Sequence, residues 1–263
     1  MTEMSKTSGI SQTSRSPLEF LENPQSIRTI LFDVGFTLLR VRPSEAEICL
    51  RVCRELDLHI DEETMTERLE EAENYFFQQT RKNRHIWGDQ QAIDTLWIGY
   101  YSTLLRPLIA EHDEQRLHQL ASAINKEFGK HTSWEIYPDV LPTLKALREQ
   151  GYTLGVVSDW GISLGSILSN LGLTHYFDTV VISAALRHGK PSPHLYEQAL
   201  ERTNSIPDYT LHIGDSYIFD VLGARSVGIT PVLLDRHHRV DPNKMDCLTV
   251  HSLMDLLEIL EVS

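Results

Sequence analysis

Residues 29–37 read TILFDVGFT, an apolar run that ends in an acidic residue and continues into a segment containing glycine. The run 29–33 suits a strand that is buried on both faces of a parallel sheet, because such strands carry apolar side chains without alternation. Asp33 stands at the carboxyl end of this predicted strand. In open parallel sheets, ligands bind beyond the carboxyl ends of the strands. Asp33 is therefore the first candidate for a functional residue.

Helical and strand patterns alternate from residue 134 to the end of the chain. Strands are predicted over 152–158, 179–183, 210–214 and 229–234, and helices over 139–150, 193–204, 219–227 and 252–260, with one more ending near 172. Such alternation implies right-handed βαβ units and a parallel sheet covered on both faces. The predicted fold class is α/β, a three-layer α/β/α Rossmann-like parallel sheet.

The stretch 42–130 has a different character, because it shows helical patterns alone. Ser44 and Glu47 form a capping-box signature near its start. Helices are predicted over roughly 44–58, 62–80, 89–105 and 113–129. We therefore expect a four-helix unit inserted into the core. The predicted organisation is a disordered tail over 1–26, an α/β core formed by 27–41 plus 131–263, and the helical insertion over 42–130.

The composition excludes several kinds of partner. The 263 residues include 24 Lys and Arg against 37 Asp and Glu, a formal net charge of −13. Nucleic acids attract clusters of Lys and Arg, so this acidity argues against a nucleic-acid partner. No apolar run approaches the roughly 20 residues that a membrane helix needs, and the polar N-terminus lacks a secretory signal. We expect a cytoplasmic protein without nucleic-acid or membrane partners, either a monomer or a homodimer.

Other polar residues also follow predicted strands. These strand-end residues are Ser158 with Asp159, Ser183, and Asp215. Asp220 follows Asp215 closely, and the pair brackets the start of a helix, where N-terminal capping explains one carboxylate better than two. Lys190 lies in the loop after Ser183 and directly precedes a proline, which limits local freedom. Each residue has a structural explanation alone, but all of them follow predicted strands, at the sheet edge where ligands bind.

Four segments, taken in order, resemble the four motifs of the haloacid dehalogenase superfamily. They are FDVGFTLL at 32–39, VVSDWG at 156–161, HGKPSPHLY at 188–196 and IGDSYIFDVLGARSVG at 213–228. The likeness covers nearly everything from 27 to 234, and the helical insertion stands where this family carries its type-I cap. The resemblance therefore implies a Rossmann-like core with a helical cap.

The resemblance also implies a hydrolase that acts on a small phosphorylated substrate. Asp33 would attack the substrate and form an aspartyl intermediate, which divides one difficult step into two. Ser158 and Lys190 would act in catalysis and, with Asp159, bind the substrate. A Mg²⁺ ion would reduce the repulsion between the approaching anions. The implied metal ligands are Asp33, the carbonyl of Gly35, Asp215 and Asp220.

Gly35 departs from the family pattern. Phosphatases of this superfamily carry a second Asp two residues after the nucleophile, which protonates the leaving group and then activates water. Loss of a general acid–base group typically costs about 10²–10⁴-fold in rate. Three explanations stay open: a weak phosphatase, or one acting on good leaving groups such as acyl phosphates; a phosphonatase-like or dehalogenase-like hydrolase; and a non-catalytic binding protein with the same fold.

A cap histidine is one candidate for the missing acid. His85 and Trp87 lie between two predicted cap helices, in RKNRHIWGD at 81–89, from which they could reach the site. The simpler interpretation is a loop histidine beside a packed aromatic ring, since histidine has many structural uses.

Overall fold

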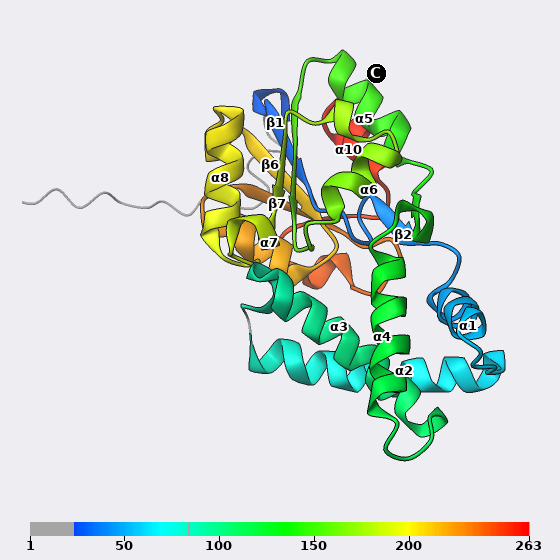
Figure 1. Ribbon diagram of the computed structural model, residues 1–263. Coiled ribbons are helices and arrows are strands. Elements are labelled where there is room, and N and C mark those ends of the chain that lie inside the picture. Colours follow the sequence, from blue (N-terminus) through cyan, green and yellow to red (C-terminus); the bar gives the residue numbers. More distant parts are fainter. Residues whose placement is uncertain (1–23, 84, 263) are drawn as a thin grey trace, which may run out of the picture.

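The computed structural model describes residues 24–83 and 85–262, and Figure 1 shows an α/β body that holds the sheet and a helical body below it. The predicted disordered tail lies outside the described residues up to residue 23. Pro24–Ser26 forms a short 3-10 turn that leads into the first strand.

A six-stranded parallel sheet forms the centre of the α/β body, in the order β5-β4-β1-β6-β7-β8. The strands are β1 (Thr29–Phe32), β4 (Thr153–Ser158), β5 (Thr179–Ile182), β6 (Thr210–Gly214), β7 (Thr230–Leu234) and β8 (Leu248–Val250). Strand β1 lies between β4 and β6, and all of its residues are buried. The apolar run therefore forms the predicted central strand, and Asp33 emerges at the middle of the sheet edge.

Helices cover both faces of the sheet, because successive side chains of a strand point to opposite faces. Ile30 and Phe32 pack with one helical layer, whereas Leu31 packs with the other. The first layer contains α5 (Val140–Glu149), α6 (Leu164–Asn170) and α10 (Leu253–Ile259), and the second contains α7 (Ser183–Leu186), α8 (Pro193–Thr203) and α9 (Leu222–Arg225). Figure 1 shows α5, α6 and α10 on one side of the strands and α7 and α8 on the other. The predicted three-layer α/β/α fold is confirmed.

The helical body is the predicted insertion, and we call its four helices the cap. They are α1 (Glu45–Glu55), α2 (Glu62–Lys82), α3 (Gln90–Leu105) and α4 (Glu114–Phe128). Ser44 and Glu47 form the predicted capping box at the start of α1. The cap has its own apolar core, to which α1, α2, α3 and α4 all contribute. It is thus a packed unit rather than an extension of the sheet.

The structure adds elements that the sequence patterns did not indicate. Strands β2 (Leu39–Val41) and β3 (Trp134–Ile136) pair antiparallel and join the cap to the core. Each has three residues, too few for a periodic pattern to identify. The predicted helix over 219–227 begins earlier, with the π-helical turn Tyr217–Val221. In the described ranges, no helix is long and apolar enough to cross a membrane.

Candidate active site

The carboxyl ends of three adjacent strands bring the candidate residues together. Phe32 pairs with Val156 of β4 and with Ile213 of β6, so the residues that follow these strands meet at one edge. Asp33 is almost completely buried there. The hydroxyl of Ser158 donates a hydrogen bond to Oδ1 of Asp33 over 3.2 Å. Two of the predicted site residues are therefore in direct contact.

Lys190 reaches the same point from the loop after α7. Its side chain is 2% exposed, and Nζ lies 2.7 Å from Oδ1 of Asp33 and 2.6 Å from Oδ1 of Asp220. Burial alone would lower the pKa of the ammonium group, but the two carboxylates outweigh it and raise the pKa well above its usual value. Lys190 is therefore a buried cation held between two carboxylates, which is the arrangement that makes a buried charge tolerable.

Asp220 has hydrogen-bond partners at both of its oxygens. Oδ1 faces Nε2 of His212 at 3.0 Å in addition to Lys190, and Oδ2 accepts the backbone N–H of Ser216 over 3.0 Å. Burial alone would raise the pKa of this carboxyl, but Lys190 and His212 hold it well below its usual range. The π-helical turn places Asp220 against the Cα of Gly214, where a side chain has no room. Asp220 is thus a fixed carboxylate.

His212 is a residue that the sequence patterns missed. It lies on β6 and is completely buried, with its Nε2 atom against Asp220 and its ring edge-on to Tyr196. Burial lowers its pKa, so the neutral imidazole predominates and Nε2–H can donate to the carboxylate. The only available signal was one polar ring within the apolar strand TLHIG.

Three carboxylates at the site fit a divalent cation. Asp33, Asp215 and Asp220 each offer one oxygen, and these oxygens lie within 4.8 Å of one another. Hard oxygen donors of this kind suit Mg²⁺. Although Asp215 reaches solvent, the surrounding protein and the charges of Asp33 and Asp220 raise its pKa to about 7. A bound cation would relieve this repulsion. The carbonyl of Gly35 as a further ligand stays a prediction.

An indole ring lies beside Gly35. A Cβ atom at residue 35 would stand 3.5 Å from Cζ3 of Trp160. Trp160 packs against Trp134, with ring centroids 4.5 Å apart. The hydroxyl of Ser183 accepts a hydrogen bond from the backbone N–H of Trp160 over 3.0 Å and donates one to the backbone carbonyl of Trp160 over 3.2 Å. Ser183 therefore positions the loop after β4, and an aromatic ring lies next to the position where family phosphatases carry their acid.

Asp159, predicted to bind substrate, lies directly after Ser158. Its Oδ1 accepts the backbone N–H of Lys190 over 2.9 Å, which ties the loop after β4 to the loop that carries the lysine. Burial raises the pKa of this carboxyl to about 7, although Lys190 opposes the shift. Asp159 is therefore a fourth carboxyl near the site, outside the group of three that fits a metal.

The cap lies against the core at this edge. Gln90 accepts the N–H of Ile162 through Oε1 over 2.8 Å. Trp87 lies so close to Gly189 that a Cβ there would approach Cβ of Trp87 to 2.7 Å. His85 is exposed, and its imidazole makes no hydrogen bond within the described residues. Trp87 and Gln90 thus bring the cap against the loop that carries Lys190 and the loop after β4, while His85 as a proton donor gains no support.

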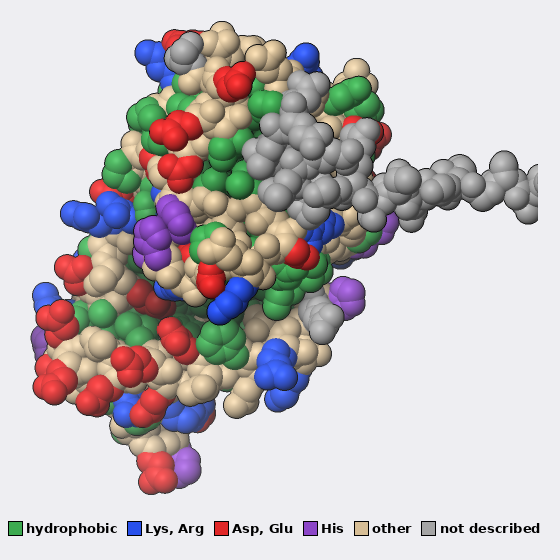
Figure 2. Space-filling view, turned by 180° about the vertical axis from the view of Figure 1, so that it is seen from behind, with side chains coloured by type: hydrophobic (Ala, Val, Ile, Leu, Met, Phe, Trp, Pro, Cys, Tyr) green, Lys and Arg blue, Asp and Glu red, His purple; other side chains and the backbone are tan. Residues whose placement is uncertain are grey.

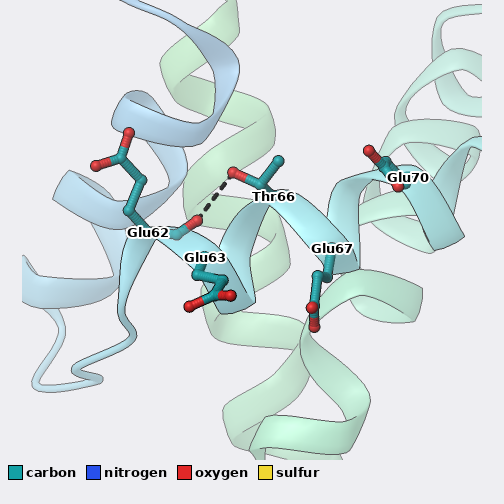
Figure 3. Close-up of a pocket in the computed structure, with 5 residues that line it drawn as sticks. All are labelled: Glu62, Glu63, Thr66, Glu67 and Glu70. Carbon is teal, nitrogen blue, oxygen red and sulfur yellow. Dashed lines mark hydrogen bonds between the residues drawn. The ribbon is translucent and has the colours of Figure 1, made fainter.

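Acidic side chains gather on the cap surface away from the site. Figure 2 shows Asp and Glu side chains clustered over the lower lobe of the molecule, which is the cap. One shallow pocket on α2 is lined by Glu62, Glu63, Thr66, Glu67 and Glu70. In Figure 3, these carboxylates spread away from the helix instead of pointing toward one another. This surface is therefore a solvated acidic helix face rather than a binding site.

A parallel α/β core with a helical cap, and a buried lysine between two aspartates at the strand ends, define a capped hydrolase of the haloacid dehalogenase type. The sequence profile of the family described as "Haloacid dehalogenase-like hydrolase" matches residues 30–234. The chain therefore belongs to the haloacid dehalogenase-like hydrolase family.

Individual relatives agree with this assignment. The chain is 33% identical over 215 residues to haloacid dehalogenase-like hydrolase domain-containing protein 3 of Danio rerio, covering 80% of this chain and 86% of that protein. The motifs quoted above resemble the same group. The chain is also 30% identical over 186 residues to pyrimidine 5'-nucleotidase YjjG of Escherichia coli, covering 65% of this chain and 81% of that protein. The crystal structure of a HAD phosphatase from Thermococcus onnurineus superimposes with a TM-score of 0.61 at 26% identity, covering 90% of this chain and 99% of that one.

Proposed function

We propose that this protein is a Mg²⁺-dependent, phosphatase-type hydrolase that acts on a small phosphorylated metabolite through an aspartyl intermediate on Asp33. The observation that carries the proposal is the position of Lys190, whose Nζ lies within 2.7 Å of both Asp33 and Asp220. A phosphate ester and a carboxylate nucleophile repel each other, and a buried cation beside the nucleophile offsets that repulsion. The nucleotidase and phosphatase relatives support phosphoester chemistry.

Most residues of the site have a defined task in this reaction. One carboxylate oxygen of Asp33 attacks phosphorus, while Ser158 and Lys190 bind the transferring phosphoryl group. Mg²⁺ would be held by Asp33, Asp215, Asp220 and the carbonyl of Gly35, and would neutralise charge on the phosphoryl oxygens. His212 and the N–H of Ser216 keep Asp220 in place for both the metal and the lysine.

Activity toward esters with poor leaving groups is expected to be modest if no other residue replaces the acid missing at position 35. Gly35 supplies no proton, and the neighbouring ring of Trp160 has no ionisable group. The absence of a general acid typically costs about 10²–10⁴-fold. Acyl phosphates and nitrophenyl phosphates need little protonation, so the proposed enzyme is expected to prefer them.

The second candidate is a non-catalytic binding protein with the same fold. The observation in its favour is the same glycine, since an intact metal site without an acid can still bind a phosphorylated ligand. On either proposal, the protein is expected to be a cytoplasmic monomer or homodimer.

Phosphate release separates the two candidates. The purified protein is assayed with p-nitrophenyl phosphate and acetyl phosphate in the presence of Mg²⁺, with Asp33→Asn as the matched control. We expect turnover by the wild type that the Asp33→Asn variant lacks. Equal rates for the two proteins would refute the nucleophile assignment. Calorimetric Mg²⁺ binding without turnover of either substrate would favour the binding protein.

A further inference from the structure

Most of the carboxyl groups close to Asp33 already have a task. Asp220 is occupied by Lys190, His212 and the N–H of Ser216. Asp215 belongs to the carboxylate group that fits a metal. Asp159 differs, because only its Oδ1 is engaged, by the N–H of Lys190. Within the described ranges, its Oδ2 makes no hydrogen bond, so one oxygen of a well-held carboxyl stays available.

Asp159 also lies where the core meets the cap, the side toward which a leaving group is expected to depart. In phosphoryl transfer, the attacking and leaving oxygens are roughly in line, so the leaving oxygen lies across phosphorus from Asp33. Asp33, Ser158 and Lys190 all belong to the core. Trp87 of the cap and Asp159 meet at Gly189, where an added Cβ would lie 2.7 Å from Cβ of Trp87 and 3.5 Å from Oδ1 of Asp159. The carboxyl of Asp159 is therefore placed at the boundary between core and cap.

We infer that Asp159 replaces the missing residue at position 35 as the proton donor and acceptor of the reaction, an inference that rests on the proposed function. As Asp33 attacks phosphorus, the bond from phosphorus to the leaving oxygen breaks, and its electron pair stays on that oxygen. The proton passes from Oδ2 of Asp159 to the leaving oxygen. In the second step, the carboxylate of Asp159 takes a proton from water as that water attacks the aspartyl phosphate. The bond from phosphorus to Asp33 breaks, and both carboxyl groups return to their starting states.

The surroundings of Asp159 support both directions of proton transfer. Its carboxyl is flanked by the cation of Lys190 and feels the negative charges of Asp33 and Asp220. Burial together with these charges raises its pKa to about 7, which suits a group that donates and accepts a proton near neutral pH. The indole of Trp87 has no charge, so the cap side adds an apolar wall.

The test compares leaving groups in the Asp159→Asn variant, whose amide oxygen can still accept the N–H of Lys190. The kcat/KM for the aryl ester reports events up to departure of the phenol. We expect Asp159→Asn to lower kcat/KM for phenyl phosphate by about 10²-fold or more, and that for p-nitrophenyl phosphate by only a few-fold. The slowed second step predicts a burst of nitrophenol and a phosphorylated protein visible by intact mass. The double variant Gly35→Asp with Asp159→Asn should recover much of the loss, because it puts a carboxyl at the position where family phosphatases carry their acid. The substitution should fit, since a Cβ at residue 35 meets Trp160 at an ordinary 3.5 Å.

The outcomes distinguish this inference from the proposed function. An equal loss of kcat/KM for both aryl esters, or no loss for either, overturns the role of Asp159 while leaving Asp33 as the nucleophile. Activity above that of Asp33→Asn on acetyl phosphate alone overturns the role of Asp159 and keeps the nucleophile. A wild type no more active than Asp33→Asn on acetyl phosphate and on both esters removes the proposed function and this inference with it. Circular dichroism and thermal unfolding of Asp159→Asn show whether a uniform loss comes from misfolding, in which case Asp159 is structural and the inference is wrong.

Discussion

The carboxylate of Asp220 occupies the space that a side chain at residue 214 would fill. A Cβ on Gly214 would approach Oδ1 of Asp220 to 2.6 Å, and other atoms of the same carboxyl more closely. The glycine at the end of β6 therefore lets the π-helical turn fold back against the strand. That contact places Asp220 within reach of Lys190.

Gly214→Ala is expected to displace the carboxylate of Asp220 and disorganise the site. A misplacement of about 1 Å can cost about 10²-fold in rate, so we predict at least that loss of phosphatase activity and weaker Mg²⁺ binding by calorimetry. Gly165→Ala in α6 is the control, because a Cβ there has open space. It should change stability by no more than about 1 kcal/mol. Normal activity in Gly214→Ala would contradict the predicted role of this contact.

Lys190→Met is expected to remove both activity and a large part of the stability. Deleting one partner of a buried ion pair leaves uncompensated charge, which typically costs about 3–5 kcal/mol. Urea unfolding of the metal-free protein measures the free energy of unfolding directly. The matched control is Lys145→Met, since the ion pair of Lys145 with Glu149 is exposed and such pairs contribute about 0–1 kcal/mol. Similar losses of unfolding free energy for the two variants would show that the buried ion pair contributes no more stability than the exposed one.

Ser183→Ala is predicted to loosen the loop after β4. Ser183 itself is not expected to contact the substrate. The completely buried hydroxyl makes two hydrogen bonds to the backbone of Trp160. An unsatisfied buried group costs about 1–3 kcal/mol, so thermal unfolding should occur at a lower temperature. The emission spectrum of the tryptophans should shift as Trp160 gains solvent. An unchanged spectrum and midpoint would argue that another contact holds the loop.

Asp139 is predicted to contribute stability that is lost in acid. Burial alone would raise its pKa, but Arg236 together with Ser252 and the N–H of Leu253 lowers it below the usual value. A carboxyl with a depressed folded pKa stabilises the protein above its unfolded pKa of about 3.9 and loses that contribution as the pH falls further. Asp139→Asn should therefore show a smaller decline in unfolding free energy below about pH 4 than the wild type. Parallel pH profiles would contradict this assignment.

Most of the fold could be predicted because its signals are local. The apolar run before Asp33 required a strand buried on both faces, and the capping box at Ser44 marked the first cap helix. The strand-end rule then grouped Asp33, Ser158 and Asp215 at one edge, where the structure places them.

The rest of the site depends on contacts between distant segments. The interaction of His212 with Asp220 depends on a π-helical turn that no propensity encodes, and the indole beside Gly35 comes from the loop of another strand. The short ribbon of β2 and β3 pairs two segments that lie on either side of the insertion and are far apart in the sequence. A residue pattern shows which side chains follow a strand, but not which ones then turn back toward each other.

That ribbon has a consequence for how the molecule is assembled. The chain leaves the core after Val41 and returns at Trp134, and these two residues pair directly across the ribbon. The chain therefore enters and leaves the cap at neighbouring points. The path of the chain through the core does not depend on the length of the segment between these points. A change in the length of the inserted segment could therefore be accommodated without moving the strands of the core.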